Sequence, residues 1–494
     1  MPENFEQEPS STWQRPETTT LGAFFNARQP EGSELSGVRL ISQPREAFRA
    51  RYALAGQAEH TLDLQYYLWK GDTTGRLLLH QVFQAADRGV KVRLLIDDIF
   101  HRGRDVSYAA IDQHPNVQVR VFNPMGNRGL AKQANFMVHK SKLNHRMHNK
   151  IFLADNAVAI IGGRNIGDDY FGIDPKLNFL DLDVLAVGPA AQQAGEAYDL
   201  YWNSTKAVPI GALLDKPPPP EALAEMREEL ELNLGDVLDK MPYRVPLKDH
   251  ELQEALLSLA EELSWVEAEI IVDPLDRFDG REVSKFVLLG ERMAEKVEKE
   301  MVIQTAYLIP TSEGIDVIRK LTERGIRVRV MTNSLQSNNH ISVHAHYMKY
   351  RKALIEAGAE LYELRADNRL IEYYKQTDSR VADSHAGMHT KAFVVDDDIS
   401  MIGSYNLDPR SRIWNSEIGL LITGEAFTQK VLESMNEVFE PQNSYRLTLN
   451  EKGKLIWSGE GPSGTEVWTH DPGAGWWRRA LARMISWLPI ENEL

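Results

Sequence analysis

Two histidine–lysine pairs give the strongest chemical signal in the sequence. His148 and Lys150 stand two residues apart, and so do His389 and Lys391. A neutral imidazole can attack phosphorus, and a protonated imidazole can donate a proton to a leaving oxygen. Neighbouring ammonium groups can hold the non-bridging oxygens as negative charge develops. Two such pairs in one site therefore predict phosphoryl-transfer chemistry, and the residues alone leave open which histidine is the nucleophile.

Each pair belongs to a longer pattern, H-x-K-x4-D-x6-G-[GS]-x-N, which occurs in full in both halves of the chain. Two complete copies in register are not accidental, whereas a single bare H-x-K-x4-D would be weak evidence. We predict one active site in which the two copies face each other. The catalytic motif residues are His148, Lys150, Asp155, His389, Lys391 and Asp396, and the candidate substrate-binding residues are Asn165, Asn406, Gly163 and Ser404.

The two motif aspartates begin turns. In the first copy, apolar runs flank Asp155 and Asn156, which favours a hairpin with a two-residue turn. That register would place Gly163 opposite His148, and Ser404 opposite His389 in the second copy, leaving room for a phosphate above the strand. Each aspartate lies an odd number of residues after its histidine, so along a strand the two side chains would point to opposite faces. We therefore interpret both aspartates as structural and not as general acids.

A free histidine titrates at about 6.5, so one neutral and one protonated histidine in the same site require neighbours that shift their pKa values apart. Acidic residues downstream of each motif are the candidate neighbours. Glu417 is followed seven positions later by Gly424, and Asp181 is followed at the same spacing by Gly188. Asp181 is therefore the predicted counterpart of Glu417, with Asp183 as the second choice. We expect Asp181 and Glu417 to orient the histidines.

Composition narrows the function further. The chain has 494 residues, no cysteine and a formal net charge of −15. The sequence shows no carboxylate cluster for a metal, so we expect neither a metal nor another cofactor. The acidic balance argues against a dedicated nucleic-acid partner. No apolar run is long enough to span a bilayer, and the N-terminal stretch lacks the apolar region of a signal peptide.

The chain reads as a duplicated α/β protein. Strands alternating with helices from residue 38 onward favour βαβ units and a mixed sheet with much parallel pairing, and the second half repeats this order. We expect helices flanking each sheet and pseudo-two-fold symmetry between the lobes. The predicted units are a disordered tail (1–32), lobe 1 (36–215), a connector (216–263), lobe 2 (264–442) and a C-terminal extension (443–494).

Two further segments carry charge or apolar patterns. Between Asp112 and Asp155 the chain has no acidic residue, and we expect its cations to form a basic approach for an anionic substrate; they are Arg120, Arg128, Lys132, Lys140, Lys142, Arg146 and Lys150. Residues 476–488 have helical periodicity with tryptophans, other apolar residues and arginines. This amphipathic helix fits an interfacial membrane anchor, and the alternative is a helix that buries its apolar face on the core.

The two copies resemble the HKD motifs of the phospholipase D superfamily, and the resemblance covers nearly the whole chain. Several stretches are similar to the bacterial cardiolipin synthases of the C type, namely residues 146–150, 162–171 and 347–351 and the basic, Trp-containing C-terminus. The resemblance implies two phospholipase D-like lobes and transfer of a phosphatidyl group through a phosphohistidine. It favours His148 as the nucleophile.

The implied product is cardiolipin, made from phosphatidylglycerol and a second phospholipid such as phosphatidylethanolamine. The implied location is the surface of the bacterial inner membrane, with the enzyme bound peripherally. One alternative is a hydrolytic phospholipase D that releases phosphatidic acid, because the same residues serve water as acceptor. The other alternative is a phosphodiesterase nuclease of the same superfamily. The net charge of −15 argues against a nuclease.

Overall fold

The computed structural model describes residues 5–101, 103–125, 144–280, 282–372, 379–461 and 464–494. Its strands are β1 (Ser36–Ile41), β2 (Thr61–Tyr66), β3 (Lys91–Asp97), β4 (Val117–Phe122), β5 (Ile151–Ala154), β6 (Val158–Gly162), β7 (Leu177–Leu180), β8 (Asp183–Val187), β9 (Ala207–Pro209), β10 (Ser264–Val272), β11 (Glu300–Thr305), β12 (Arg327–Asn333), β13 (Glu360–Leu364), β14 (His385–Met388), β15 (Lys391–Val395), β16 (Ile399–Gly403), β17 (Ile418–Thr423), β18 (Ser444–Leu449), β19 (Leu455–Gly461) and β20 (Gly464–Trp468).

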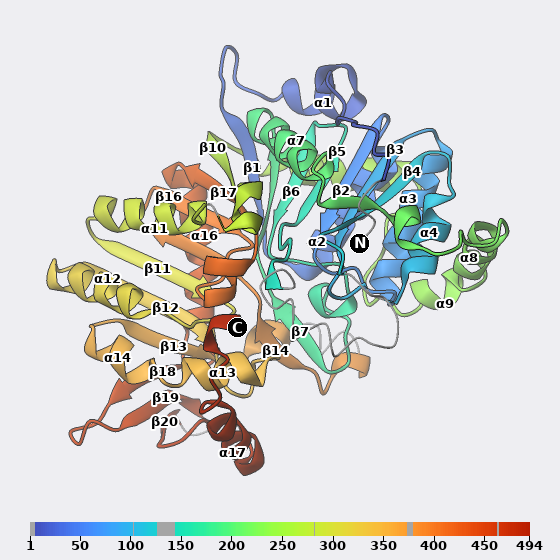
Figure 1. Cartoon of the computed structure of the whole chain (residues 1–494). Coiled ribbons are helices and arrows are strands. Elements are labelled where there is room, and N and C mark those ends of the chain that lie inside the picture. The colour runs from blue at the N-terminus through green and yellow to red at the C-terminus, as the bar shows by residue number, and fades with distance from the viewer. Residues whose placement is uncertain (1–4, 102, 126–143, 281, 373–378, 462–463) are drawn as a thin grey trace.

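The α-helices of the described residues cover both faces of the strands (Figure 1). They are α1 (Thr20–Asn26), α2 (Pro44–Gln57), α3 (Thr73–Asp87), α4 (Asp105–Asp112), α7 (Pro189–Trp202), α8 (Ala222–Leu232), α9 (Leu234–Leu238), α10 (Asp249–Glu261), α11 (Lys285–Lys296), α12 (Ser312–Glu323), α13 (Ile341–Tyr347), α14 (Arg351–Glu356), α16 (Glu425–Phe439) and α17 (Trp476–Ile485).

One mixed sheet of 18 strands runs through the molecule. The pairings give the order β9-β4-β3-β2-β5-β6-β8-β1 for the first lobe, and β10-β17-β16-β15-β11-β12-β13-β18-β19-β20 for the second. Strand β1 pairs with β10, so the two lobes join at the middle of the sheet. Read outward from that seam, both lobes repeat the same strand order. The predicted duplicated α/β fold with pseudo-two-fold symmetry is confirmed.

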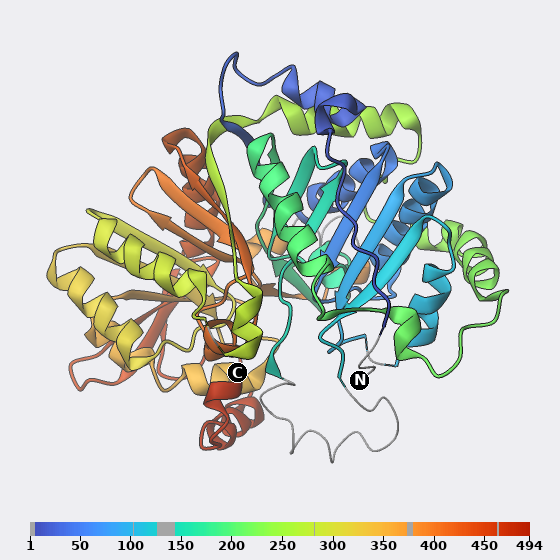
Figure 2. The ribbon, with the colours of Figure 1, turned by 45° about the horizontal axis from the view of Figure 1, so that its top comes forward.

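The seam between the lobes is a shared apolar core. Val38, Val184 and Ala186 of the first lobe pack in one cluster with Val394, Ile422 and other residues of the second. Helix α7 packs against β10 of the opposite lobe, and α16 packs against β1 in the same way. Figure 2 shows the two lobes side by side, each with its own strands. Burial of apolar area at the seam holds the two halves in a fixed relation.

The segment around Asp181 is not one continuous strand. It is split into β7 and β8, with Asp181 and Leu182 between them. Strand β7 leaves the main sheet and pairs in parallel with β14 of the other lobe. The break turns the Asp181 side chain toward that lobe, which no local pattern in the sequence indicates.

The prediction of a disordered N-terminal tail is wrong for most of that stretch. Thr12, Leu21 and Phe25 are buried, and α1 begins after Thr19, whose side chain accepts a hydrogen bond from Gly22 N. The side chain of Gln7 donates to the carbonyl of Trp202 at 2.9 Å. The apolar residues among the polar ones are sufficient to dock the segment on the first lobe.

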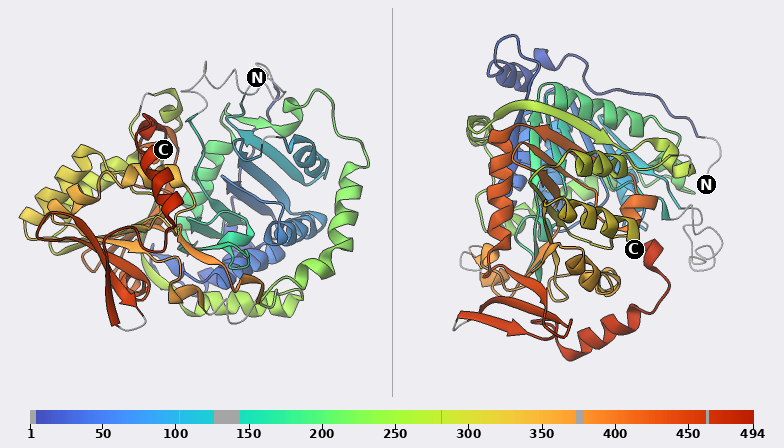
Figure 3. Two further views of the ribbon diagram at one scale, coloured as in Figure 1. Left: turned by 90° about the horizontal axis from the view of Figure 1, so that it is seen from below. Right: turned by 90° about the vertical axis from the view of Figure 1, so that its left-hand side faces the viewer.

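Residues 216–263 carry α8, α9 and α10, which pack on α4, α3 and α2 of the first lobe. Figure 3 shows these helices running around the outer side of that lobe. In the part of the chain that the structure describes, no helix is both long enough and apolar enough to cross a membrane.

Candidate active site

His148 follows Arg146 and Met147, which lie beside the second lobe. Its backbone N–H donates to the carbonyl of Ser416 at 2.9 Å. Its ring Nδ1 lies 2.8 Å from Oε2 of Glu417, and the ring of Tyr67 meets it edge-on at 4.8 Å between centroids. The imidazole is therefore fixed in orientation, with Nδ1 bound to a carboxylate and Nε2 left for chemistry.

His389 mirrors this arrangement with the roles of the lobes exchanged. Its backbone N–H donates to the carbonyl of Leu180 at 2.8 Å, and its Nδ1 lies 2.7 Å from Oδ2 of Asp181. The rings of Tyr170 and Phe179 flank the imidazole at 5.1 and 5.2 Å. Each histidine is thus oriented by a carboxylate of the opposite lobe, so the two motifs form one site at the seam.

Burial controls the pKa of the histidines. Burial lowers the pKa of His148 to about 4, although Glu417 acts in the opposite direction. Burial also lowers the pKa of His389 well below its ordinary value, and the charges of Lys391, Lys150 and His148 add to that effect. Because Lys150 and His148 of the first lobe lower the pKa of His389 in the second, the two motifs interact electrostatically. Both imidazoles are neutral in the empty site at neutral pH.

The lysines are desolvated as well. Burial lowers the pKa of Lys150 to about 7, and that of Lys391 to about 8. Lys150 Nζ donates to the carbonyl of His148 at 2.5 Å, and Lys391 Nζ donates in the same way to the carbonyl of His389. An ammonium has three donors. Each lysine therefore keeps N–H groups that can donate hydrogen bonds to an anionic phosphate. The negative charge of such a phosphate would raise the pKa values of both lysines.

The two orienting carboxylates differ in their partners. Burial raises the pKa of Glu417, but His148, Lys150 and Ser404 outweigh it and hold that pKa below the usual range. Ser411 adds a second hydroxyl donor at 2.8 Å. Burial raises the pKa of Asp181 to about 6, against the charges of Lys391 and Arg164. Glu417 is therefore the more firmly ionised of the two.

The predicted register of the motif hairpins is wrong by one residue. Ala154 pairs with Val158 and Val395 pairs with Ile399, so three residues form each connection instead of two. Asp155 and Asn156 both adopt positive φ. The extra residue lets the Asp155 carboxylate face back toward the start of the neighbouring strand β2.

The histidines consequently do not lie opposite Gly163 and Ser404. A Cβ added at Gly163 would come within 2.2 Å of Oδ1 of Asp181, so the missing side chain makes room for that carboxylate and not for a phosphate above the strand. Ser404 Oγ donates to Glu417. Both small residues therefore support the orienting carboxylates.

The motif aspartates accept backbone hydrogen bonds. Asp155 accepts from the N–H groups of Glu59, His60 and Thr61 at 2.7 to 2.9 Å. Asp396 accepts from the equivalent N–H groups of residues 298–300 at 2.7 to 3.0 Å. The carboxylates thus satisfy the start of the strand that runs beside each motif, which is a structural role.

The two motif asparagines have different surroundings. Asn165 donates to the hydroxyl of Tyr170 at 2.9 Å and accepts from Leu68 N at 3.2 Å, so its amide supports the wall beside His389. The buried Oδ1 of Asn406 has no hydrogen-bond partner within the described part of the chain. Direct contact of either asparagine with substrate stays a prediction.

Asp97 and Ser411 are site residues that sequence reasoning missed. Asp97 ends β3, and its carboxylate accepts from Met147 N at 2.9 Å, which places the residue just before His148. Ser411 donates to Glu417 and accepts from Asn406 N at 3.2 Å. A polar residue at the carboxyl end of a buried strand was the available signal for Asp97.

The expected basic approach is only partly described by the structure. Arg120 points away from the site and donates to the carbonyls of Trp202 and Glu8, so it does not serve an anionic substrate. Arg146 is buried against Asp97. Arg128, Lys132, Lys140 and Lys142 lie outside the described residues. Among the residues described, no group of three or more His, Asp or Glu side chains could hold a metal ion.

Comparisons with known proteins agree with this geometry. A family model described as "Cardiolipin synthase, PLD-like domain" matches residues 53–194 and 292–439, one match around each motif. Cardiolipin synthase C of Escherichia coli (strain K12) is 34% identical over 461 residues, which cover 92% of this chain and 95% of the relative. Major cardiolipin synthase ClsA of Bacillus subtilis (strain 168) is 24% identical over 406 residues, or 82% of this chain and 69% of the relative.

A solved structure supports the fold. The phosphatidylserine synthase of Haemophilus influenzae Rd KW20 superposes with a TM-score of 0.57 at 13% identity, over 93% of this chain and 97% of that one. The resemblance to the phospholipase D superfamily is confirmed by the match of both motif regions and by the extent of the E. coli alignment. On these grounds the chain belongs to the cardiolipin synthase, PLD-like domain family.

Proposed function

We propose that the protein is a phosphatidyltransferase that forms cardiolipin from phosphatidylglycerol and a second phospholipid through a phosphohistidine. The single observation that carries the proposal is the crossed pair of histidine–carboxylate contacts, His148 with Glu417 and His389 with Asp181. Family membership and the 34% identity to an E. coli cardiolipin synthase support the lipid substrate. The proposed catalytic groups are the two histidines and the two lysines.

In the first step, Nε2 of one neutral histidine attacks the phosphorus of the donor lipid. The bond between phosphorus and the head-group oxygen breaks, and the other histidine, in its protonated form, gives that oxygen its proton. The phosphatidyl group is now bound to the nucleophile. Both lysines hold the non-bridging oxygens as charge develops on them.

In the second step, a hydroxyl of phosphatidylglycerol attacks the phosphohistidine. The histidine that acted as acid now takes the hydroxyl proton, the P–N bond breaks, and both histidines return to their starting states. Water in place of the hydroxyl would give phosphatidic acid, so the identity of the acceptor alone separates a synthase from a phospholipase D. Two displacements at one phosphorus predict retention of configuration.

Substrate charge prepares the acid. In the empty site burial holds the pKa of His148 at about 4, and the ammonium of Lys150 also disfavours its protonation. A bound phosphodiester brings one negative charge beside these groups and raises the histidine pKa values. The protonated acid is therefore formed in the substrate complex.

The substrate is a membrane lipid, so we also propose that the protein acts at the surface of the bacterial inner membrane as a peripheral protein.

The test uses purified protein and phosphatidylglycerol, alone and with phosphatidylethanolamine, with lipid products separated by mass. Cardiolipin supports the proposal, and ethanolamine or glycerol release identifies the donor. Phosphatidic acid without cardiolipin would assign the chain to the hydrolases. The His148→Ala variant, which lacks one of the two reacting imidazoles, is the matched control for contaminating lipases.

A further inference from the structure

Helix α17 exposes an aromatic face that nothing in the described chain covers. Trp477 is 70% exposed, Met484 60% and Trp487, just beyond the helix, 84%. Trp476 stacks on Trp477 with 4.1 Å between ring centroids. At about 100° per residue, Trp476, Trp477, Leu481, Met484, Trp487 and Leu488 fall within roughly 140° of the helix circumference. Exposed apolar patches of this kind mark interaction sites.

The opposite side of α17 is already packed. Ala482 is fully buried beside Leu335 and Ala345, and Ile485 packs on the same cluster, so α17 rests on α13. Arg478 donates to the carbonyls of Leu335 and Asn338 at 2.8 and 2.6 Å. Ile485 and Arg478 therefore hold the helix to the second lobe and do not face outward with the tryptophans.

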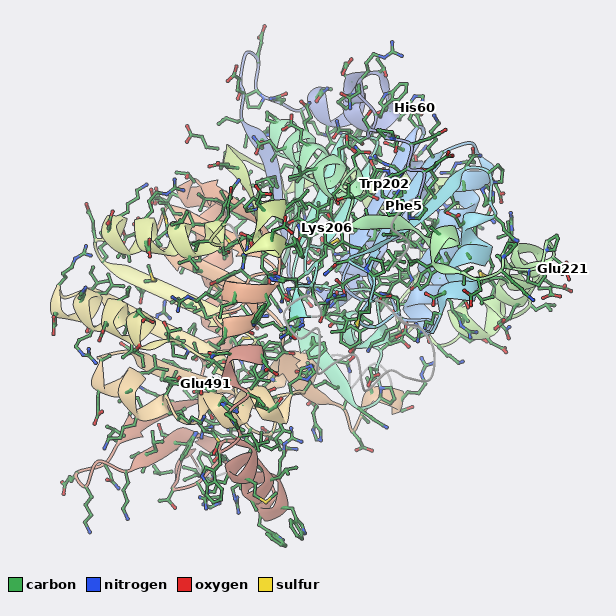
Figure 4. All side chains as sticks on the ribbon, viewed as in Figure 1. Phe5, His60, Trp202, Lys206, Glu221 and Glu491 are labelled. Atoms are coloured by element: carbon green, nitrogen blue, oxygen red, sulfur yellow. The ribbon has the colours of Figure 1, made fainter. Side chains whose placement is uncertain are left out.

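Contacts of the acidic residues Asp471 and Glu491 fix the chain on either side of α17. Before the helix, Asp471 binds Arg351 at 2.6 Å, and Arg351 also binds the buried Glu363. After the helix, Glu491 binds His346 and Lys349, each at 3.1 Å. Figure 4 places Glu491 against the second lobe, and Figure 1 shows α17 at the lower edge of the molecule, beyond β19 and β20. The exposed face is therefore presented by a rigid element and not by a loose tail.

The chemistry of this face fits an anionic lipid surface. No acidic residue occurs between Gly475 and Pro489, in a chain whose net charge is −15. Arg479 and Arg483 lie beside the Trp476 edge of the apolar arc, where they can reach phosphate groups. Tryptophan is favoured at membrane–water interfaces. A groove of about 440 Å³ between α17 and residues Asn339 and Ile341 adds space for an inserted acyl chain.

Residues 491–494, which follow α17 and are called the clamp below, also connect this helix to the active site. Trp414 donates to the carbonyl of Asn492 at 2.6 Å, and Arg410 N donates to the carbonyl of Leu494 at 2.8 Å. Residues 410–414 form one short turn that leads directly to Glu417, the partner of His148. The segment that follows α17 therefore lies against the same turn that positions the active-site carboxylate.

We infer that α17 is a preformed docking helix that seats Trp477, Met484, Trp487 and their neighbours in an anionic phospholipid bilayer and thereby holds the active site at the lipid surface. The inference rests on the proposed lipid substrate. Removing the whole C-terminal segment is not a clean test, because Glu491 and Leu494 belong to the clamp. Substitutions confined to the exposed face are required.

The test compares the triple variant Trp477→Ser/Met484→Ser/Trp487→Ser with a control, Leu232→Ser/Leu247→Ser, whose side chains are 75% and 51% exposed on the connector. Partition onto vesicles of phosphatidylglycerol and phosphatidylcholine is measured by sedimentation without turnover. We expect the triple variant to lose at least tenfold in partition, the control to keep wild-type partition, and all three proteins to melt at the same temperature. Wild-type partition should fall when phosphatidylcholine replaces the anionic lipid.

Unchanged partition of the triple variant would overturn the inference, and so would a large drop in its melting temperature, which would place the face in a protein contact. Activity on dihexanoyl phosphatidylglycerol below its micelle concentration separates this inference from the proposed function. The triple variant should match the wild type on this dispersed substrate and lose activity on vesicles. Absence of wild-type activity on every phospholipid would contradict the proposed function while leaving the partition result standing.

Discussion

Nδ1 of His148 lies 2.8 Å from Oε2 of Glu417, a residue 269 positions later in the chain and in the other lobe. His389 makes the reciprocal contact with Asp181 at 2.7 Å across 208 positions. Each half of the protein thus supplies a histidine and the carboxylate that orients the histidine of the other half. Neither lobe contains both members of either pair, so these histidine–carboxylate contacts exist only across the seam.

Replacing Glu417 with Gln should lower kcat by about 10²-fold to 10⁴-fold, because an amide cannot stabilise the imidazolium or hold its tautomer in the same way. Nitrogen-15 NMR of the histidine rings should report a changed His148 and an unchanged His389. Glu425→Gln, on the exposed first turn of α16, is the matched control. A perturbed His389 with an intact His148 would refute the crossed arrangement.

His148→Ala and His389→Ala should each reduce turnover by at least about 10³-fold, and the double variant should be little worse, since nucleophile and acid act as a unit. Steady-state rates on phosphatidylglycerol vesicles measure all three. Additive losses would mean that the two histidines work independently. The wild-type rate should survive EDTA; inhibition by the chelator would reveal a metal requirement.

An activated phosphodiester with a p-nitrophenyl leaving group bypasses the acid and can assign the histidine roles. With His148 as nucleophile, the His389→Ala variant should form a phosphoenzyme and retain it, because the base for the second step is missing. Mass spectrometry of rapidly quenched protein locates the phosphoryl group. Label on His389 in the His148→Ala variant would reverse the assignment.

When an oxyanion binds in the active site above neutral pH, the protein should take up protons from solution. Burial lowers the pKa of Lys150 from 10.5 to about 7 and that of Lys391 to about 8. Their neutral forms therefore stabilise the empty fold above pH 10.5, and this contribution is lost as the pH falls toward 7 to 8. Vanadate or tungstate should restore the charges, so calorimetry at pH 8 in buffers of different ionisation enthalpy should show net uptake. No uptake would mean that both ammonium groups are already charged.

Asp155→Ala should lower the free energy of unfolding by about 2–4 kcal/mol, because it leaves the N–H groups of Glu59, His60 and Thr61 without their acceptor. Urea denaturation measures the change, and kcat of the folded fraction should remain within a few-fold of wild type. Asp397→Ala, on the exposed turn of the second copy, should change neither quantity. A stable but inactive Asp155 variant would give this aspartate a chemical role.

The sequence predicts the periodic features of this protein well, since repeats, alternating strands and motif spacing are local properties. It identifies Asp181 and Glu417 from their equal distance to a glycine. It cannot show that these carboxylates cross between lobes, because the pairing of β7 with β14 is a long-range event. The sequence does not predict the hairpin register, because the third turn residue is fixed by the contacts of Asp155 with a distant strand. It also does not predict that Thr12, Leu21 and Phe25 are buried, because the N-terminal segment around them is mostly polar.

The stereochemical course at phosphorus tests the central claim most directly, namely that one shared site performs two displacements through a phosphohistidine. Phosphatidylglycerol carrying a chiral phosphorothioate would serve as donor, and the configuration of the thio-cardiolipin product would be determined. Two in-line displacements at the same phosphorus, the first forming and the second breaking the bond to the nucleophilic histidine, predict retention of configuration. Inversion would show a single direct displacement and would contradict the account.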